Sequence, residues 1–71
     1  MSSRYYTMKL KGQAGQTDRI QVRDSSFDLL GHFLAAELPA IAQLLGENYP
    51  EPALGVFFRE LPYHRLIRIQ L

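Results

Sequence analysis

A chain of 71 residues with eight basic side chains, seven acidic side chains and no cysteine is long enough for one small domain. The lack of cysteine excludes a disulfide framework and a thiolate metal site, and two histidines alone are too few for a structural zinc site. We therefore expect one domain over residues 1–71, stabilised by its packing, by self-association or by membership of a larger complex.

No segment has the pattern of a signal peptide or a membrane span. The first eleven residues lack a continuous apolar run, and the most apolar segment, residues 26–46, is interrupted by Asp28, His32, Glu37 and Pro39. A chain without cysteine suits a reducing compartment, so we expect a cytoplasmic protein.

Two alternating segments near the start predict an antiparallel hairpin. In residues 4–11, Tyr6, Met8 and Leu10 alternate with Tyr5, Thr7, Lys9 and Lys11. In residues 19–23, Ile20 and Val22 alternate with polar neighbours. We expect the apolar set to face the core: Tyr6, Met8, Leu10, Ile20 and Val22.

The apolar segment Ser26 to Gly46 predicts the core helix. Its large apolar residues recur every three or four positions, which places them on one helix face. Ser25 and Asp28 have the spacing of a capping box, and Gly46 is expected at the C-terminal cap. Because Pro39 removes a backbone donor, we expect a kink there, or two short helices with Pro39 in the first turn of the second.

The last part of the chain predicts two further strands, separated at Pro62. In the second of them, Ile67, Ile69 and Leu71 would face the core. The first run, residues 53–61, is expected as a strand, with a short helix over residues 52–61 as the alternative, because brief apolar runs suit both.

These elements predict an α+β fold in the order ββαββ. A four-stranded antiparallel sheet would be covered on one face by one kinked helix. The strand order does not follow from the sequence.

Charge is segregated along the chain, and this is the main functional signal. Residues 1–23 carry five basic side chains and one acid, whereas residues 24–52 carry five acids and no lysine or arginine. By strand alternation, six basic and two aromatic side chains would share the sheet face turned away from the helix. This candidate binding set consists of Tyr5, Lys9, Lys11, Arg19, Arg23, Phe57, Arg59 and Arg68.

We expect a small non-enzymatic binding or adaptor module that docks this basic, aromatic-bearing face onto an acidic protein partner, as an oligomer or complex subunit. The same face suits sequence-independent binding of single-stranded nucleic acid, because cations contact phosphates and aromatic rings stack on bases. It would also suit the acidic helix of a neighbouring copy. The alternative to a binding role is that these side chains only keep an exposed sheet face solvated and discourage aggregation.

Catalysis, cofactors and metals have little support in the sequence. On a helix, Asp28 and His32 would lie one turn apart and could share a proton or a metal, but no suitable third partner is evident nearby. The Gly12 to Gly15 segment is too short for a phosphate-binding loop and lies between strands. We expect no enzymatic activity, no cofactor and no metal.

Overall fold

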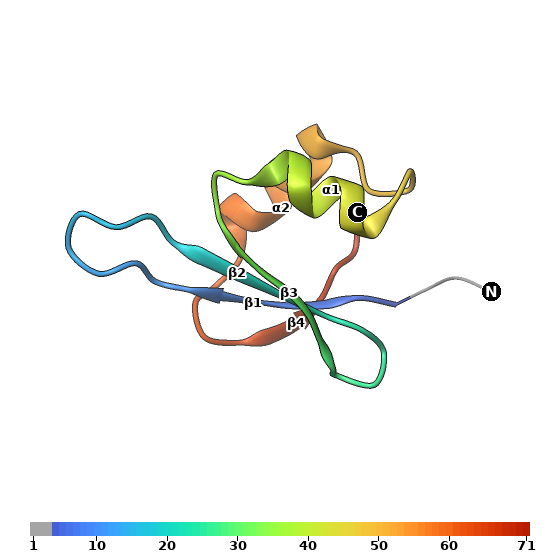
Figure 1. The fold of residues 1–71 in the computed structure, drawn as a ribbon, viewed down its shortest axis with the longest axis horizontal. Helices are drawn as coiled ribbons and strands as arrows, with labels where there is room; N and C mark the ends of the chain where they lie inside the picture. The colour runs from blue at the N-terminus through green and yellow to red at the C-terminus, as the bar shows by residue number, and fades with distance from the viewer. Residues whose placement is uncertain (1–3) are drawn as a thin grey trace.

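In a computed structural model that describes residues 4–71, four strands form one antiparallel sheet and two helices cover one of its faces (Figure 1). The elements follow the order β1 (Tyr6–Leu10), β2 (Arg19–Arg23), β3 (Leu29–Leu34), α1 (Leu38–Leu45), α2 (Glu51–Glu60) and β4 (Leu66–Arg68). The sheet order is β3-β2-β1-β4, so β3 and β4 are its edges. The α+β class and the four-stranded antiparallel sheet are confirmed, whereas the ββαββ order and the single kinked helix are wrong.

The segment expected to begin the long helix is a turn followed by β3. Asp24 Oδ1 accepts hydrogen bonds from the backbone N–H groups of Ser26 (2.8 Å) and Asp28 (3.0 Å), and Phe27 has a positive φ of 67°. These contacts close a turn between β2 and β3 instead of capping a helix. The residues of β3, LLGHFL, are almost all apolar, so their spacing does not distinguish a helix from a strand. Their pairing with β2 decides the conformation.

α1 has the boundaries that its proline and glycine predict. Pro39 lies in the first turn, where its missing N–H has no helical partner to lose. Gly46 follows the last turn with a φ of 97° and donates its N–H to the carbonyl oxygen of Ala42 (2.9 Å). The expectations of Pro39 in the first turn of a helix and of Gly46 as its cap are confirmed.

α2 replaces the strand expected over residues 53–61, so the helical alternative is confirmed and the strand is wrong. Pro52 lies in its first turn, where the missing N–H has no helical partner to lose. Glu51 also lies in the first turn and Arg59 in the last, which is the arrangement of charge that the helix macrodipole favours. Leu54 and Phe58 are buried, one helical turn apart. In the described chain, residues 4–71, neither helix is long and apolar enough to span a membrane.

β1 turns the opposite face to the core from the one expected. Thr7 pairs with Val22 and Lys9 with Ile20, and directly opposed residues share a face of the sheet. Thr7 and Lys9 are only 0% and 8% exposed beneath the helices. The inward orientation expected for Tyr6, Met8 and Leu10 is therefore wrong.

Hydrogen bonds explain how Lys9 is tolerated inside. Its Nζ donates to the backbone carbonyl oxygens of Phe58 (2.9 Å) and Arg59 (3.4 Å) in the last turn of α2. It also lies 4.8 Å from the centre of the Tyr63 ring. The ammonium group thus adds a donor to carbonyls in the last turn of a helix, where intrahelical donors are lacking.

The core lies between the sheet and the two helices. Its buried apolar residues are Ile20, Val22, Ile41, Leu45, Leu54, Phe58, Leu61 and Ile69. In and after β4, Ile67 and Ile69 face this core as expected. Leu71 is 55% exposed, so the expectation that it faces the core is wrong.

Candidate functional site

The sheet face opposite the helices forms a mixed apolar and basic surface. The strand register and the alternation of side chains define this outer sheet face. It consists of Tyr6, Met8, Leu10, Arg19, Gln21, Arg23, Leu29, Leu30, His32, Leu34, Leu66 and Arg68.

Large apolar side chains on this face are open to solvent. Leu30, Leu34 and Leu66 are 41–42% exposed, and a register shift between β2 and β3 leaves Leu29 half exposed as well. The Phe27 ring, from the turn before β3, is also half exposed and lies 4.8 Å from the ring of Tyr6. Large exposed apolar patches on a small protein are typical of interaction surfaces, which makes this face a candidate site.

Three arginines accompany these apolar residues, and the outer sheet face contains no acidic side chain. Arg23 donates hydrogen bonds to the carbonyl oxygen of Phe27 (2.9 Å) and to Gln21 Oε1 (3.3 Å), so it also stabilises the turn. Arg19 and Arg68 are exposed and make no side-chain hydrogen bond or ion pair with any described residue. Their guanidinium groups are available to a partner.

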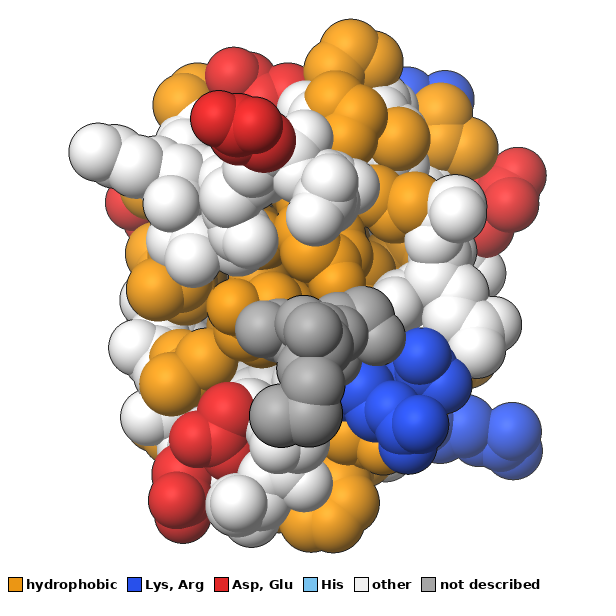
Figure 2. Space-filling model, turned by 90° about the vertical axis from the view of Figure 1, so that its right-hand side faces the viewer, with side chains coloured by type: hydrophobic (Ala, Val, Ile, Leu, Met, Phe, Trp, Pro, Cys, Tyr) orange, Lys and Arg blue, Asp and Glu red, His pale blue; other side chains and the backbone are white. Residues whose placement is uncertain are grey.

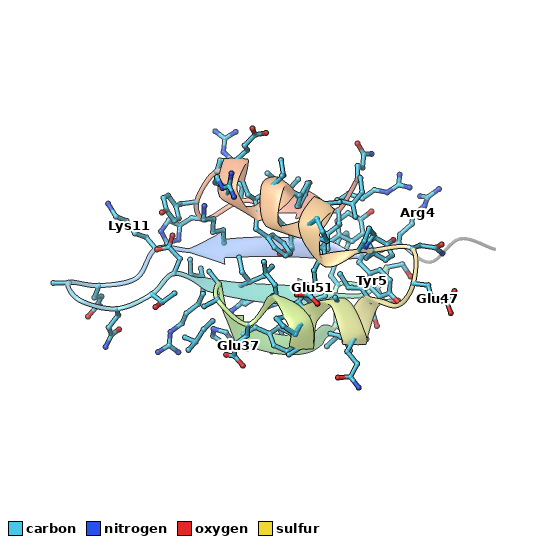
Figure 3. All side chains as sticks on the ribbon, turned by 90° about the horizontal axis from the view of Figure 1, so that it is seen from above. Arg4, Tyr5, Lys11, Glu37, Glu47 and Glu51 are labelled. Carbon is cyan, nitrogen blue, oxygen red and sulfur yellow. The ribbon has the colours of Figure 1, made fainter. Side chains whose placement is uncertain are left out.

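The other five predicted binding residues do not lie on the outer sheet face. Tyr5 and Phe57 pack against the core from the helix side, and Lys9 is buried there. Lys11 is exposed beyond the end of β1 (Figure 3), and Arg59 is exposed on α2. The predicted common face is wrong because it relied on the inverted alternation of β1 and on a strand over residues 53–61.

The two layers of the molecule differ in charge. The helix layer, residues 35–61, carries four glutamates and one arginine. Figure 3, which views the molecule from the helix layer, labels three of these glutamates, Glu37, Glu47 and Glu51. The remaining described residues, which form the sheet and its loops, carry seven basic and three acidic side chains. Seen from the right-hand side of Figure 1, hydrophobic side chains run through both layers, and basic ones gather on one side of the sheet layer (Figure 2).

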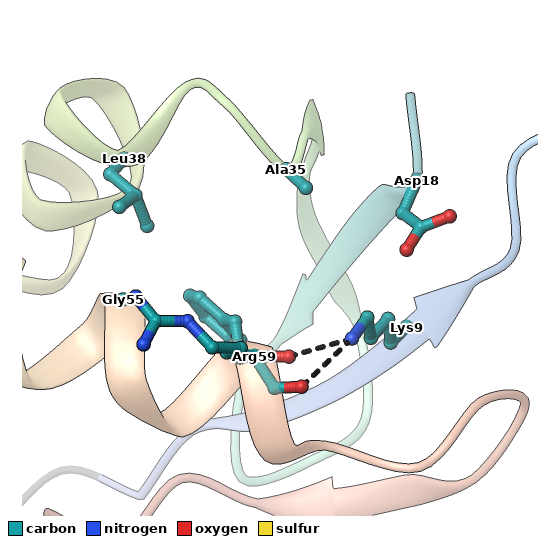
Figure 4. A pocket seen from close by; sticks show the side chains of 7 residues that line it. Lys9, Asp18, Ala35, Leu38, Gly55 and Arg59 are labelled. Carbon is teal, nitrogen blue, oxygen red and sulfur yellow. Dashed lines mark hydrogen bonds between the residues drawn. The ribbon is translucent and has the colours of Figure 1, made fainter. Parts of the chain in front are cut away.

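A pocket of about 290 Å³ opens between the helices and the first hairpin (Figure 4). Lys9 and Asp18 line one side, and Leu38, Gly55 and Arg59 line the other. The Lys9 ammonium in this pocket is already bound to the end of α2. Its role is structural, which leaves the outer sheet face as the candidate site.

Asp18 joins the first hairpin to the segment before β4. Its Oδ1 accepts the backbone N–H of Gly12 (2.9 Å), and its Oδ2 accepts the Tyr63 hydroxyl (2.7 Å). The hydrogen bond from Gly12, followed by that from Tyr63, holds the pKa of the Asp18 carboxyl below its ordinary value. The same contact with the Asp18 carboxylate raises the pKa of the Tyr63 phenol.

Asp18→Asn should reduce the acid sensitivity of the fold. Because folding lowers the pKa of Asp18, its contribution to stability is present above the ordinary aspartate pKa of about 3.9 and is lost as the pH falls through the lowered value. In urea unfolding between about pH 6 and pH 2, the gap between the wild type and Asp18→Asn should close at the acidic end. Asp28→Asn serves as the control, because the Asp28 side chain bonds no described residue. A gap that does not change with pH would contradict this role of Asp18.

The suggested metal or acid–base pair is not on a helix. Asp28 lies in the turn before β3 and His32 within β3, so the one-turn separation on which the idea depended does not exist. No group of three or more potential ligands, whether His, Cys, Asp or Glu, occurs within residues 4–71.

Comparisons with models of protein families, with curated proteins and with solved structures found no match to this chain. The geometry of the outer sheet face therefore carries the functional argument.

Proposed function

We propose that the protein is a non-enzymatic docking module that binds a protein partner through its outer sheet face. One observation carries this proposal: half-exposed leucines and three arginines share a face without a single acidic side chain. Protein interfaces combine apolar contact with arginine in this way. The partner that fits has an apolar centre surrounded by aspartate and glutamate.

The placement of the arginines supports an acidic partner. Arg19 and Arg68 lie on β2 and β4, on opposite sides of β1, and Met8 lies between their strands. A guanidinium group binds a carboxylate through two parallel hydrogen bonds, so two separated arginines set the orientation of the partner as well as attracting it. The apolar residues between them supply contact area that charge alone does not.

Single-stranded nucleic acid fits the outer sheet face less well. Such binding depends on a cationic groove and on open aromatic rings that stack with bases. Leucines and Met8 occupy much of this face, and Tyr5 and Phe57, the aromatics expected for stacking, lie on the helix side. The two rings that do lie here, Tyr6 and Phe27, contact each other.

Site-specific photo-crosslinking tests where the partner binds. A photoreactive amino acid at position 21, in the central strand pair, should capture a partner in the cells that produce the protein. The same group at position 56, which is 50% exposed on the helix layer, is the control. Equal capture from both positions would contradict docking through the outer sheet face.

Charge reversal then tests the arginines against the captured partner in purified form. The double variant Arg19→Glu/Arg68→Glu should bind about tenfold more weakly or worse, and Arg59→Glu, on the helix layer, should bind as the wild type does. Unchanged affinity in the double variant would overturn the proposal. Salt-sensitive binding to labelled single-stranded DNA or RNA that the double variant loses would assign the face to nucleic acid instead.

A further inference from the structure

The backbone of β3 has hydrogen-bonding groups that point away from the sheet. Ala35 donates its N–H to the carbonyl oxygen of Asp18 (2.8 Å), just beyond the pairs that join β3 to β2. Because antiparallel residues alternate between hydrogen-bonded and non-hydrogen-bonded positions, Gly31 and Phe33 bond to β2 as Ala35 does. The backbone groups of His32 and Leu34 therefore face the open edge, as do those of Leu30, which the register shift leaves without a partner in β2.

One end of this edge is closed by the chain itself. The N–H of Leu34 donates to Glu37 Oε1 (2.9 Å), and the carbonyl oxygen of Leu34 accepts the N–H of Glu37 (2.9 Å). Leu30 and His32 remain, each with one outward donor and one outward acceptor. The open edge thus has two residues with groups for a further strand.

β3 lacks the charged side chains and the proline that often prevent edge strands from pairing, and its register shift with β2 lies at its first two residues. Its sequence, LLGHFL, contains no lysine, arginine, acid or proline. The opposite edge, β4, is only three residues long and carries Arg68. The two edges of this sheet are therefore not equivalent, and β3 is the one that accepts a partner.

We propose that β3 pairs with β3 of a second copy of this chain, antiparallel and about a two-fold axis at Gly31. In this register Leu30 of each copy lies opposite His32 of the other. The two Leu30–His32 pairs that result are both hydrogen-bonded pairs. The outward donors and acceptors of Leu30 and His32 in both copies are then all used. The two four-stranded sheets become one continuous sheet.

A second copy fits this edge for reasons of charge and shape. β3 has no lysine, arginine, aspartate or glutamate, so two identical strands meet without the repulsion that two arginine-bearing outer sheet faces would suffer. At the axis, the two Gly31 residues form a non-hydrogen-bonded pair, in which opposed chains approach most closely. Gly31 suits that position, and Phe33 already fills its inner side, since a Cβ there would meet the Phe33 ring at 2.6 Å.

Pairing through β3 would place two outer sheet faces side by side without covering either. Each copy would keep its three arginines, so a partner with two acidic patches would bind both faces at a raised effective concentration. The dimer does not depend on the proposed docking function, because it uses the sheet edge and not the face.

Amide hydrogen exchange by NMR tests this pairing residue by residue. In the wild-type protein, the amides of Leu30 and His32 should be exchange-protected at about millimolar concentration and become exposed on dilution, whereas Gly31 and Phe33 should stay protected throughout. Sedimentation equilibrium on the same samples should give a dimer that dissociates over the same concentration range. A monomer at all concentrations, or a dimer in which Leu30 and His32 exchange rapidly, would overturn the proposal.

Two matched substitutions separate the edges. Leu30→Lys and Leu66→Lys replace leucines of nearly equal exposure, 42% and 41%, on β3 and β4. Leu30→Lys should weaken dimerisation about tenfold or more, because it brings two ammonium groups to the paired strands, and Leu66→Lys should change it less than about twofold. Equal effects of the two substitutions would contradict pairing through β3.

Discussion

Lys9→Glu is expected to lower the free energy of unfolding by about 3–5 kcal/mol, and Arg19→Glu by less than about 0.5 kcal/mol. Both residues belong to the first hairpin and carry the same charge, but Lys9 is 8% exposed and Arg19 is exposed. The glutamate at position 9 would lie against the carbonyl oxygens of Phe58 and Arg59, which then lose the donor that Lys9 supplies. Urea unfolding followed by circular dichroism measures both values.

Lys9→Met is the matched control for this experiment. It keeps much of the side-chain volume and removes the charge and its hydrogen bonds, so the loss should be intermediate, about 1–3 kcal/mol. Small and equal effects of Lys9→Glu and Arg19→Glu would mean that Lys9 faces solvent, as the alternation of the sequence indicated. In that case the placement of β1 would be wrong.

Ile41→Ala should destabilise the protein by about 2–5 kcal/mol, the usual range for removing a fully buried isoleucine side chain. Ile41 is 0% exposed and, with Leu45, is one of the two buried residues of α1. A helix of eight residues is not stable in isolation, so its position depends on these contacts. The loss is large for a protein of this size, whose total stability is expected to be about 4–10 kcal/mol.

Leu44→Ala, on the same helix, provides the comparison. Leu44 is 38% exposed, so its truncation leaves a smaller void and should cost less than about 1 kcal/mol. Both variants are measured by urea unfolding at the same protein concentration, because association of the folded state would itself change apparent stability. Equal losses would show that α1 does not pack through its Ile41 side.

Sequence reasoning succeeded where single residues impose a backbone conformation. Pro39 and Gly46 mark the ends of α1 because a missing N–H and a positive φ are local requirements. It failed over residues 26–34, where a run rich in leucine and phenylalanine satisfies both helical and strand patterns. The choice there depends on pairing with β2, which is not visible in the run itself.

The candidate site was predicted in part for a related reason. Arg19, Arg23 and Arg68 were placed on one face of the sheet, and the structure brings them together there. The apolar part of that face was missed because Tyr6, Met8 and Leu10 were assigned to the core. A lysine in the middle of a strand normally marks its solvent side, and only the position of α2 shows why Lys9 is an exception.

The position of β1 between β2 and β4 also determines when the sheet can form. Thr7 of β1 pairs with Ile67 of β4, near the other end of the described chain, so this contact closes a very long loop. Contacts of this kind slow folding, because chain entropy is lost before any pairing energy is gained. During synthesis, β1 and β2 can form their hairpin early, but the second edge of β1 remains open until residues 66–68 have left the ribosome. Lys9, in turn, has no carbonyl partners until α2 has been made.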